Sequence, residues 1–206
     1  MDQSPHDYNR AATEATLEAV AAALKANNIE AIVVADAAEA RARVVDLVPE
    51  GSEVHASKSK TMEDLGLVDH FASGKYDWVR GRYVNLDRRT QGREIRKISS
   101  APDFMLGSAQ AVTEEGVLIF ASYSASQIGP ISGGAGRVIL VVGSQKIVLD
   151  LETAMRRVRE HVVPFEDARL REQMGVGTKL AQLLLIYSEA VPGRMTVVLV
   201  RAALGV

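Results

Sequence analysis

The first third of the chain alternates between helical and extended patterns of apolar residues. Between residues 9 and 28, apolar side chains recur every three to four positions, which predicts an amphipathic helix. Residues 30–35 form a short apolar run rich in β-branched side chains, which is typical of a buried strand. Asp36 is a suitable N-cap, so a second helix is expected over 37–48.

The alternation continues toward the middle of the chain. A second strand is predicted over 51–56, and the sequence Thr61-Met62-Glu63-Asp64 resembles a capping box at the start of the next helix. A short third strand is expected over 76–79 and a charged helix over 87–100. Strands that alternate with helices favour a parallel α/β sheet with right-handed crossovers.

The second half contains more apolar runs. Strands are predicted over 103–108, 116–121 and 137–143, helices over 151–162 and from Pro164 to 173, and strands over 182–187 and 195–200. Pro192-Gly193 is a turn signal between the last two strands, which predicts a C-terminal antiparallel hairpin. The expected fold is α/β, with a mixed, mainly parallel sheet flanked by helices. We expect one domain over 1–206, with residues 1–9 as a flexible tail.

Composition excludes several kinds of chemistry. The 206 residues include no cysteine, so this chain cannot supply disulfides, thiolate zinc ligands, iron–sulfur ligands or a cysteine nucleophile. With 24 Lys and Arg against 26 Asp and Glu, the formal net charge is -2, which favours neither nucleic acid nor anionic membranes as partners. No signal peptide or apolar membrane span is recognisable, so the expected location is cytoplasmic.

The first candidate site is the polar loop over 56–61, which follows a predicted strand and precedes a helix. Ligands of open parallel sheets bind beyond the carboxyl ends of the strands, and helix N-termini attract anions. Ser57, Lys58, Ser59 and Thr61 would supply hydroxyl and ammonium donors to a phosphate or carboxylate. A capped, solvated loop is the alternative interpretation, because no Gly-rich phosphate loop is present.

The second candidate site runs from Ser108 to Gly116, between two predicted strands. Glu114 or Glu115 would lie near a strand end, where a carboxylate can act as a general base or as a nucleophile on an acyl group. A polar turn with two solvated glutamates explains the same residues and is the interpretation that the pattern alone favours.

A third candidate is the small, polar loop over 122–136, which is either a binding loop or a flexible connector. Its glycines precede a strand, whereas a dinucleotide fingerprint follows one, so an NAD site is rejected. The scattered histidines show no metal-ligand spacing, and His55 is expected to be a structural residue. No metal or cofactor is predicted.

Several stretches together resemble the LUD domain family, that of lactate-utilisation protein C (YkgG-like proteins). The carrying stretches cover most of the chain from about residue 10, in the family's order and spacing: 51–66, 101–120 (with Ala111-Val112-Thr113-Glu114-Glu115-Gly116-Val117-Leu118), 141–148, 163–169 and 192–200. The tail is similar to that of stand-alone bacterial members.

The resemblance implies a fold like the superfamily of sugar-phosphate isomerases, CoA-transferases and formyltetrahydrofolate cyclo-ligases. It also implies a place in lactate or organic-acid utilisation, in some members beside iron–sulfur oxidoreductase subunits. Many relatives carry an Asn-Arg-like pair where this chain has Ser126-Gln127, so an anion contact from that arginine is absent. Glu114 resembles the acyl-accepting glutamate of superfamily CoA-transferases.

Three hypotheses remain open. In the first, Ser57, Lys58, Ser59, Thr61 and Ser108 bind a small anionic metabolite, Glu114 is its catalytic partner, and the loop of Gln127 closes over the site. In the second, an acyl-transferring or sugar-phosphate-type enzyme uses Glu114 covalently. In the third, the chain is a non-catalytic subunit of an oxidoreductase. A homo-oligomer is compatible with each. The first two require residues 57–61 and 114–115 to meet in one cleft.

Overall fold

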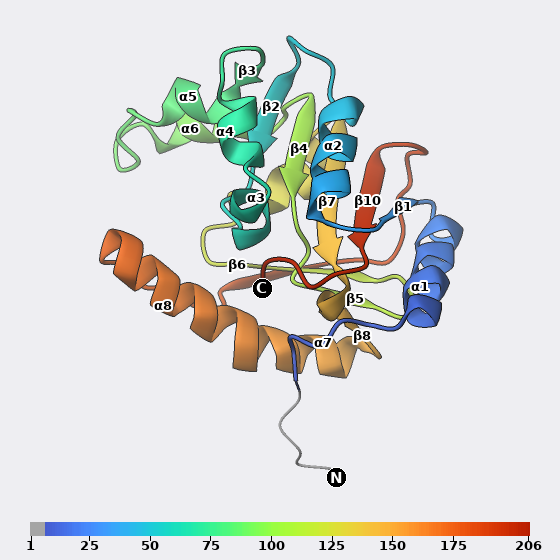
Figure 1. The fold of residues 1–206 in the computed structure, drawn as a ribbon. Coiled ribbons are helices and arrows are strands. Elements are labelled where there is room, and N and C mark those ends of the chain that lie inside the picture. The colour runs from blue at the N-terminus through green and yellow to red at the C-terminus, as the bar shows by residue number, and fades with distance from the viewer. Residues whose placement is uncertain (1–6) are drawn as a thin grey trace.

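Two β-sheets pack against each other between helices in the computed structural model, which describes residues 7–206 (Figure 1). The larger sheet has six parallel strands, in the order β1 (Glu30–Val34), β10 (Met195–Val200), β7 (Arg137–Gly143), β4 (Phe104–Gly107), β2 (Glu53–Ala56) and β3 (Asp77–Trp78). The smaller, mixed sheet has the order β8 (Ile147–Val148), β5 (Ala111–Thr113), β6 (Leu118–Ser122) and β9 (Gln182–Ile186).

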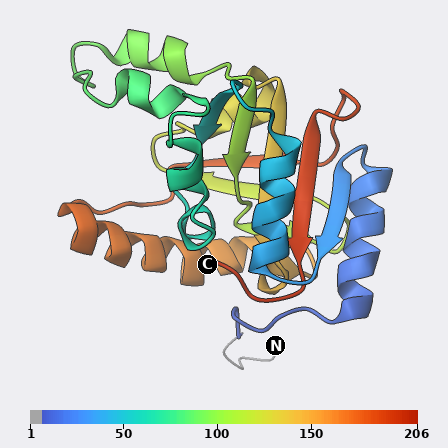
Figure 2. The same cartoon turned by 45° about the horizontal axis from the view of Figure 1, so that its top comes forward.

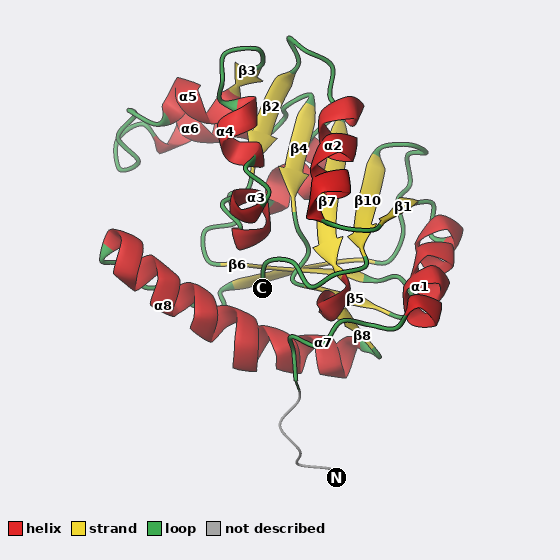
Figure 3. Cartoon of the chain, viewed as in Figure 1, coloured by secondary structure: helices red, strands yellow, loops and turns green. Residues whose placement is uncertain are grey.

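The helices cover the outer faces of these sheets (Figure 3). They are α1 (Glu14–Ala26), α2 (Ala37–Leu47), α3 (Lys60–Asp64), α4 (Leu67–Phe71), α5 (Val79–Tyr83), α6 (Gly92–Ser99), α7 (Leu151–Arg157) and α8 (Val163–Met174), with the short turns η1 (Pro130–Gly134), η2 (Ser144–Lys146) and η3 (Val158–Val162). Figure 2 shows α2 lying across one face of the large sheet and α1 along its β1 edge.

The core forms because the central strands are apolar on both faces. Along β7, Val138, Leu140 and Val142 face α1 and the small sheet, whereas Ile139 and Val141 face α2, α3 and α4. Such double burial is typical of parallel strands. The outer face of the small sheet packs on α7 and η3 in a third cluster. The order of layers is therefore helices, large sheet, small sheet, helix.

The predicted class is confirmed: the chain is α/β, with a six-stranded parallel sheet flanked by helices and a second, mixed sheet. The early elements also match the apolar pattern. Asp36 caps α2, since its side chain accepts a hydrogen bond from the backbone N–H of Glu39 at 2.9 Å. The helix predicted over 9–28 is shorter in the structure, because Thr13 is the N-cap of α1.

The predicted C-terminal antiparallel hairpin is wrong. Strand β9 pairs with β6 in the small sheet, and β10 lies between β1 and β7 in the large one, parallel to both. Pro192-Gly193 does mark a turn, at φ +73° for Gly193, but that turn carries the chain from one sheet to the other. A turn signal fixes a reversal and does not specify which strand will be paired.

The two helices predicted over 151–162 and from Pro164 form one continuous helical rod, visible in Figure 1. Val158, Val162 and Val163 all have right-handed helical dihedrals. The backbone N–H of Val163 bonds to the carbonyl of Val158, five residues back, in a π-turn. Since Pro164 has no N–H to donate, this wider turn carries the helix past it.

The tail expected over 1–9 lies outside the described residues up to position 6. Tyr8, which is described, donates a hydrogen bond from its hydroxyl to Glu160 at 2.9 Å, and its ring lies 5.4 Å from that of His161. Within residues 7–206, no helix has both the length and the apolar character needed to cross a bilayer.

Candidate functional site

A cavity of about 540 Å³ lies where three parallel strands of the large sheet end. Ser57 follows β2, Ser108 follows β4, and Lys146 closes the η2 turn that follows β7. These strands are neighbours in the order β7-β4-β2, so their carboxyl ends place the three side chains together. Helix α8, the segment 176–180 and the loop after β6 form the remaining walls. This is the edge at which open parallel sheets bind ligands.

Lys146 is the cation buried most deeply in this cavity. Its side chain is 2% exposed, yet it has no carboxylate partner among the described residues. Its Nζ donates to Thr61 Oγ1 at 2.8 Å and to Ser108 Oγ at 3.0 Å. Burial, with a smaller contribution from the charge of Arg157, lowers the pKa of Lys146 to about 7. A large fraction of this amine is therefore neutral near pH 7.

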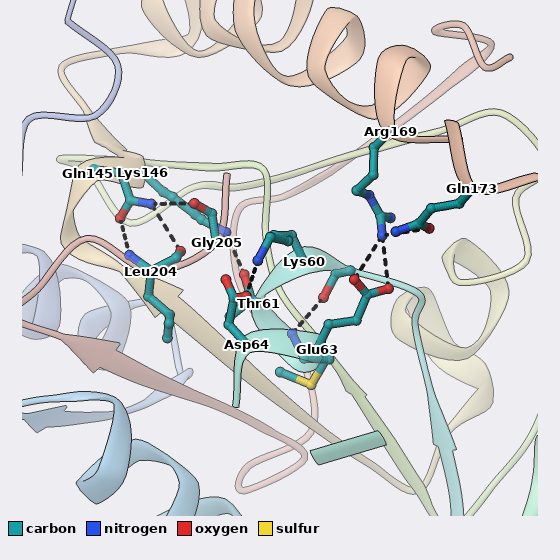
Figure 4. A network of polar contacts seen from close by, with 12 residues as sticks. Lys60, Thr61, Glu63, Asp64, Gln145, Lys146, Arg169, Gln173, Leu204 and Gly205 are labelled. Atoms are coloured by element: carbon teal, nitrogen blue, oxygen red, sulfur yellow. Dashed lines mark hydrogen bonds and ion pairs between the residues drawn. The ribbon is translucent and has the colours of Figure 1, made fainter. Parts of the chain in front are cut away.

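The polypeptide around Lys146 is held by the segment 201–206 (Figure 4). The side-chain amide of Gln145 donates to the carbonyl of Leu204 at 3.0 Å and accepts from its N–H at 3.1 Å. Gly205 lies against Thr61 with φ +68°, and a Cβ there would come within 2.2 Å of Thr61 Oγ1. Only glycine fits this contact, so the segment fixes both Lys146 and its hydroxyl partner.

The loop before α3 supplies hydroxyls of two kinds. Ser59 Oγ accepts from the N–H of Met62 at 3.3 Å and caps α3, so the cap is Ser59 and not the predicted Thr61. Ser57 is 5% exposed, and its Oγ has no hydrogen-bond partner within the described chain. The absence of a side chain at Gly107 leaves room for this hydroxyl, because a Cβ would lie 3.0 Å from it. A buried, unpartnered hydroxyl beside a cavity is available to a ligand.

Cations dominate the cavity, although the whole chain is slightly acidic. Its charged lining residues are one carboxylate, Glu166, and seven cations: Lys58, Lys60, Arg80, Arg88, Lys146, Arg169 and Lys179. Lys60 pairs with Asp64, and Arg169 pairs with Glu63 and Glu166. Across residues 7–206, the other five cations form no ion pair. Their field favours an anionic ligand.

Arg169 connects the walls of the cavity. Its Nη1 reaches both carboxylate oxygens of Glu63 on α3 at 2.9 Å (Figure 4). Its Nη2 reaches Glu166 on its own helix at 2.8 Å. Since both carboxylates neutralise this guanidinium, Arg169 holds α8 against α3 and is not a free cation. Arg80, from α5, donates to the carbonyl of Ala56 at 2.8 Å, at the end of β2.

A second buried cation lies behind Lys146. Arg157 is fully buried and donates from Nη1 to the carbonyl of Gln110 at 2.7 Å, whereas its Nε and Nη2 have no partner in the described part of the chain. Burial lowers its pKa to about 10. The same region lowers the pKa of His161, first through burial and then through Arg157 and Lys146. Positive charge therefore extends beyond the cavity wall.

The structure brings six predicted site residues into this one cavity: Ser57, Lys58, Ser59, Thr61, Ser108 and Gln127. They come from three loops that are up to 70 residues apart in sequence. Gln127 also donates from Nε2 to the carbonyl of Ala121 at 3.2 Å, which anchors its loop to β6. His55 does not line the cavity: its Nε2 lies 2.8 Å from Tyr83 Oη, and burial lowers its pKa to about 4.

Glu114 and Glu115 do not line the cavity, so the expected meeting of the two segments is not found. Gln110 lines the cavity and precedes β5, which runs away from it, so Glu114 lies roughly 13 Å further along the chain. The N–H of Glu114 bonds to Val148, and the carbonyl of Glu115 accepts from Asn27 of α1. The turn therefore packs on α1, and Glu114 is not placed to act on a ligand in the cavity.

Sequence reasoning missed Lys146 as a site residue. One signal was available: the polar segment Ser144-Gln145-Lys146 is only three residues long and joins the apolar runs that form β7 and β8, so its lysine follows the end of a central strand directly. Fully buried lysines are rare unless they are paired or functional. No group of three His, Cys, Asp or Glu side chains that could bind a metal ion is found in the described residues.

The comparisons give a family and a fold. A family model described as the LUD domain matches residues 17–200. The chain is also similar to the crystal structure of a DUF162 family protein from Deinococcus radiodurans, with a TM-score of 0.55 and 18% identity over 90% of this chain and 96% of that one. This likeness concerns the fold alone. No protein of curated function matches the sequence significantly.

Proposed function

The chain belongs to the LUD domain family, and from this premise we propose that it is a lactate-utilisation-type protein that binds a small organic anion in the cavity. The observation that carries the proposal is the group of five cations without carboxylate partners around one cavity, at the carboxyl ends of β2, β4 and β7. Field lines from several cations in one cleft raise the local concentration of anions.

The proposed contacts follow from which donors are free. Ser57 lines the cavity and its Oγ has no partner within the described chain, so it is suited to bind one oxygen of the anion. Lys58 and Arg80 line the same region and would supply charge. Lys146 keeps one position on Nζ that neither Thr61 nor Ser108 occupies. Charge-assisted hydrogen bonds of this kind are short and directional.

Thermal unfolding in the presence of carboxylates, sugar phosphates and acyl-CoAs tests this function. We expect saturable stabilisation by small carboxylates, which reaches about 2.7 kcal/mol at roughly 100 times the dissociation constant. Lys58→Ala should weaken the effect without loss of stability. Lys75→Ala is the matched control, because Lys75 pairs with Glu50 on the surface and does not line the cavity. If no carboxylate or phosphate stabilises the protein, the proposed site is rejected.

A role as an assembly subunit is a second candidate, favoured by strand β9. It is an edge strand, and its residues Leu183 and Leu185 are 41% and 38% exposed, as is Tyr187 just after it at 55%. Unpaired strand edges with apolar side chains favour pairing with another strand. We propose a second copy of this chain as the partner, because it carries the same unpaired edge and a two-fold axis pairs two such edges antiparallel through β9. Light scattering tests it: Leu183→Lys should convert dimer to monomer, and a wild-type monomer at high concentration would contradict it.

A further inference from the structure

Lys146 is the group in the cavity whose chemistry the binding of an anion does not explain. A lysine that merely attracts an anion works well at the surface, where its charge costs little. Burying an ammonium without a carboxylate partner is costly, and the protein reduces that cost by leaving the group neutral part of the time. Lys146 is buried in this way, and hydroxyls are its only hydrogen-bond partners within residues 7–206.

We propose that Lys146 is a nucleophile that condenses with the carbonyl group of a small 2-oxo acid, to form an imine in the cavity. This deepens the proposed function and rests on it, because the carboxylate of the same ligand would be held by the cationic lining. An uncharged amine selects a carbonyl carbon, and the surrounding cations select an anion. A small 2-oxo acid carries both groups on adjacent carbons.

The surroundings of Nζ favour the uncharged amine. Burial and the neighbouring charge of Arg157 disfavour the ammonium, whereas Glu166 and Asp64 favour it with smaller effects. Arg157 has two unpartnered donors and forms no ion pair with a carboxylate among the described residues. Desolvation and a second cation are the two means by which amine nucleophiles are activated in proteins.

The geometry leaves one position on Nζ for the substrate. Nitrogen has three positions besides its bond to carbon, and two are directed at Thr61 Oγ1 and Ser108 Oγ. Ser108 Oγ also lies 3.2 Å from the carbonyl of Ala109, to which it donates, so it is fixed as an acceptor from Nζ. The remaining position carries the lone pair of the neutral amine, and Lys146 lines the cavity.

The condensation balances without any further reagent. The lone pair of Nζ forms the C–N bond to carbon 2, and the π electrons of the carbonyl move to its oxygen. That oxygen takes up a proton, while the nitrogen loses one, giving a carbinolamine. The hydroxyl then leaves with a proton as water, and the nitrogen lone pair forms the C=N bond. Thr61 and Ser108 touch Nζ, so they are the hydroxyls placed to pass these protons.

Reductive trapping tests the proposal. The protein is incubated at pH 7 with pyruvate as the probe and with cyanoborohydride, which delivers hydride to an imine, and its peptides are analysed by mass spectrometry. The peptide containing Lys146 should gain the mass of pyruvic acid less one oxygen atom. We expect labelling at Lys146 to exceed that at Lys60, which lines the same cavity but pairs with Asp64, by at least tenfold.

Two controls make the outcome decisive. Lactate has the same carbon skeleton with a hydroxyl in place of the ketone at carbon 2, so it should compete with the labelling but form no adduct. Lys146→Met should remove the adduct. If that variant fails to fold, the loss of the adduct in wild-type protein saturated with lactate replaces it as the control. Equal labelling of Lys58, Lys60 and Lys146 overturns the proposal. Stabilisation by lactate without any adduct on Lys146 overturns this inference alone, whereas the absence of both overturns the proposed function too.

Discussion

The two ends of the large sheet each contain a buried cation, and the two are treated in opposite ways. At the amino end, Arg194 precedes β10 and uses every part of its guanidinium: Nε donates to Ala135, Nη1 to Glu189 and Nη2 to the carbonyls of Pro130 and Ile131. At the carboxyl end, Lys146 has two hydroxyls and no carboxylate within the described chain. The charge of Arg194 is therefore fully paired, whereas that of Lys146 has no partner of opposite charge.

This difference separates a structural cation from a functional one. Arg194 and Glu189 are both 9% exposed at their side chains, so each neutralises the other in a dry environment. Nothing further could bind to Arg194 without displacing a partner. Lys146 lines a cavity and retains a free position, which is what a ligand requires. Burial alone therefore does not indicate function, whereas a buried cation that lacks a matching partner and lines a cavity is a candidate functional group.

Replacing the two cations should give the largest contrast. Arg194→Met removes one partner of a buried ion pair and leaves Glu189 charged and alone, which should cost about 3–5 kcal/mol of unfolding free energy. Lys146→Met removes a charge that has no opposite partner, so its unfolding free energy at pH 7 should fall far less or rise. Urea denaturation of both variants measures this. Equal losses of unfolding free energy in the two variants would show that Lys146, like Arg194, has a structural role.

The pH dependence of stability should sharpen the same contrast. The folded pKa of Lys146 is about 7, below its ordinary value of 10.5, so the unfolded chain binds more protons between these values. The unfolding free energy of the wild type minus that of Lys146→Met should therefore rise from pH 7 to about 10, by up to about 1.4 kcal/mol per pH unit. Denaturation at several pH values checks it. A constant difference between the two proteins would contradict the lowered pKa.

A smaller effect distinguishes two helix caps with the same local geometry. Ser59 caps α3 at the cavity, and Asp36 caps α2 on the outer face of the large sheet. Ser59→Ala and Asp36→Ala should each cost about 1 kcal/mol of unfolding free energy. Only Ser59→Ala should also reduce the stabilisation by a small carboxylate, because Asp36 does not line the cavity. Loss of that stabilisation in both variants, or in neither, would show that the loop has no special role.

Most of the large sheet could be predicted because its pattern is local. Strand β1 and helix α2 follow from a β-branched run and a capping aspartate within residues 30–47. That the loop over 57–61 lines the cavity could be predicted for the same reason, since it follows a buried strand and precedes a helix. Ser108 and Gln127 joined it because the strands before them end at or near the same cavity.

The failures share one physical cause, which is that sequence does not specify where a strand goes. Glu114 and Glu115 were expected at the cavity, but the three residues of β5 lead the chain away from it. The C-terminal hairpin failed because β9 and β10 join different sheets. Lys146 was not predicted because its hydrogen bonds and its lowered pKa depend on Thr61, Ser108 and Arg157, which lie at distant positions in the chain.

The most direct measurement is the titration of the Lys146 amine by NMR in protein labelled at the lysine side chains, with the signal assigned by its loss in Lys146→Met. Lys146 should titrate near pH 7 in the free protein. Saturating lactate should raise that midpoint, because a bound carboxylate favours the ammonium. A signal that titrates near 10.5 and does not move when lactate is added would contradict an incompletely paired lysine that faces an anion site.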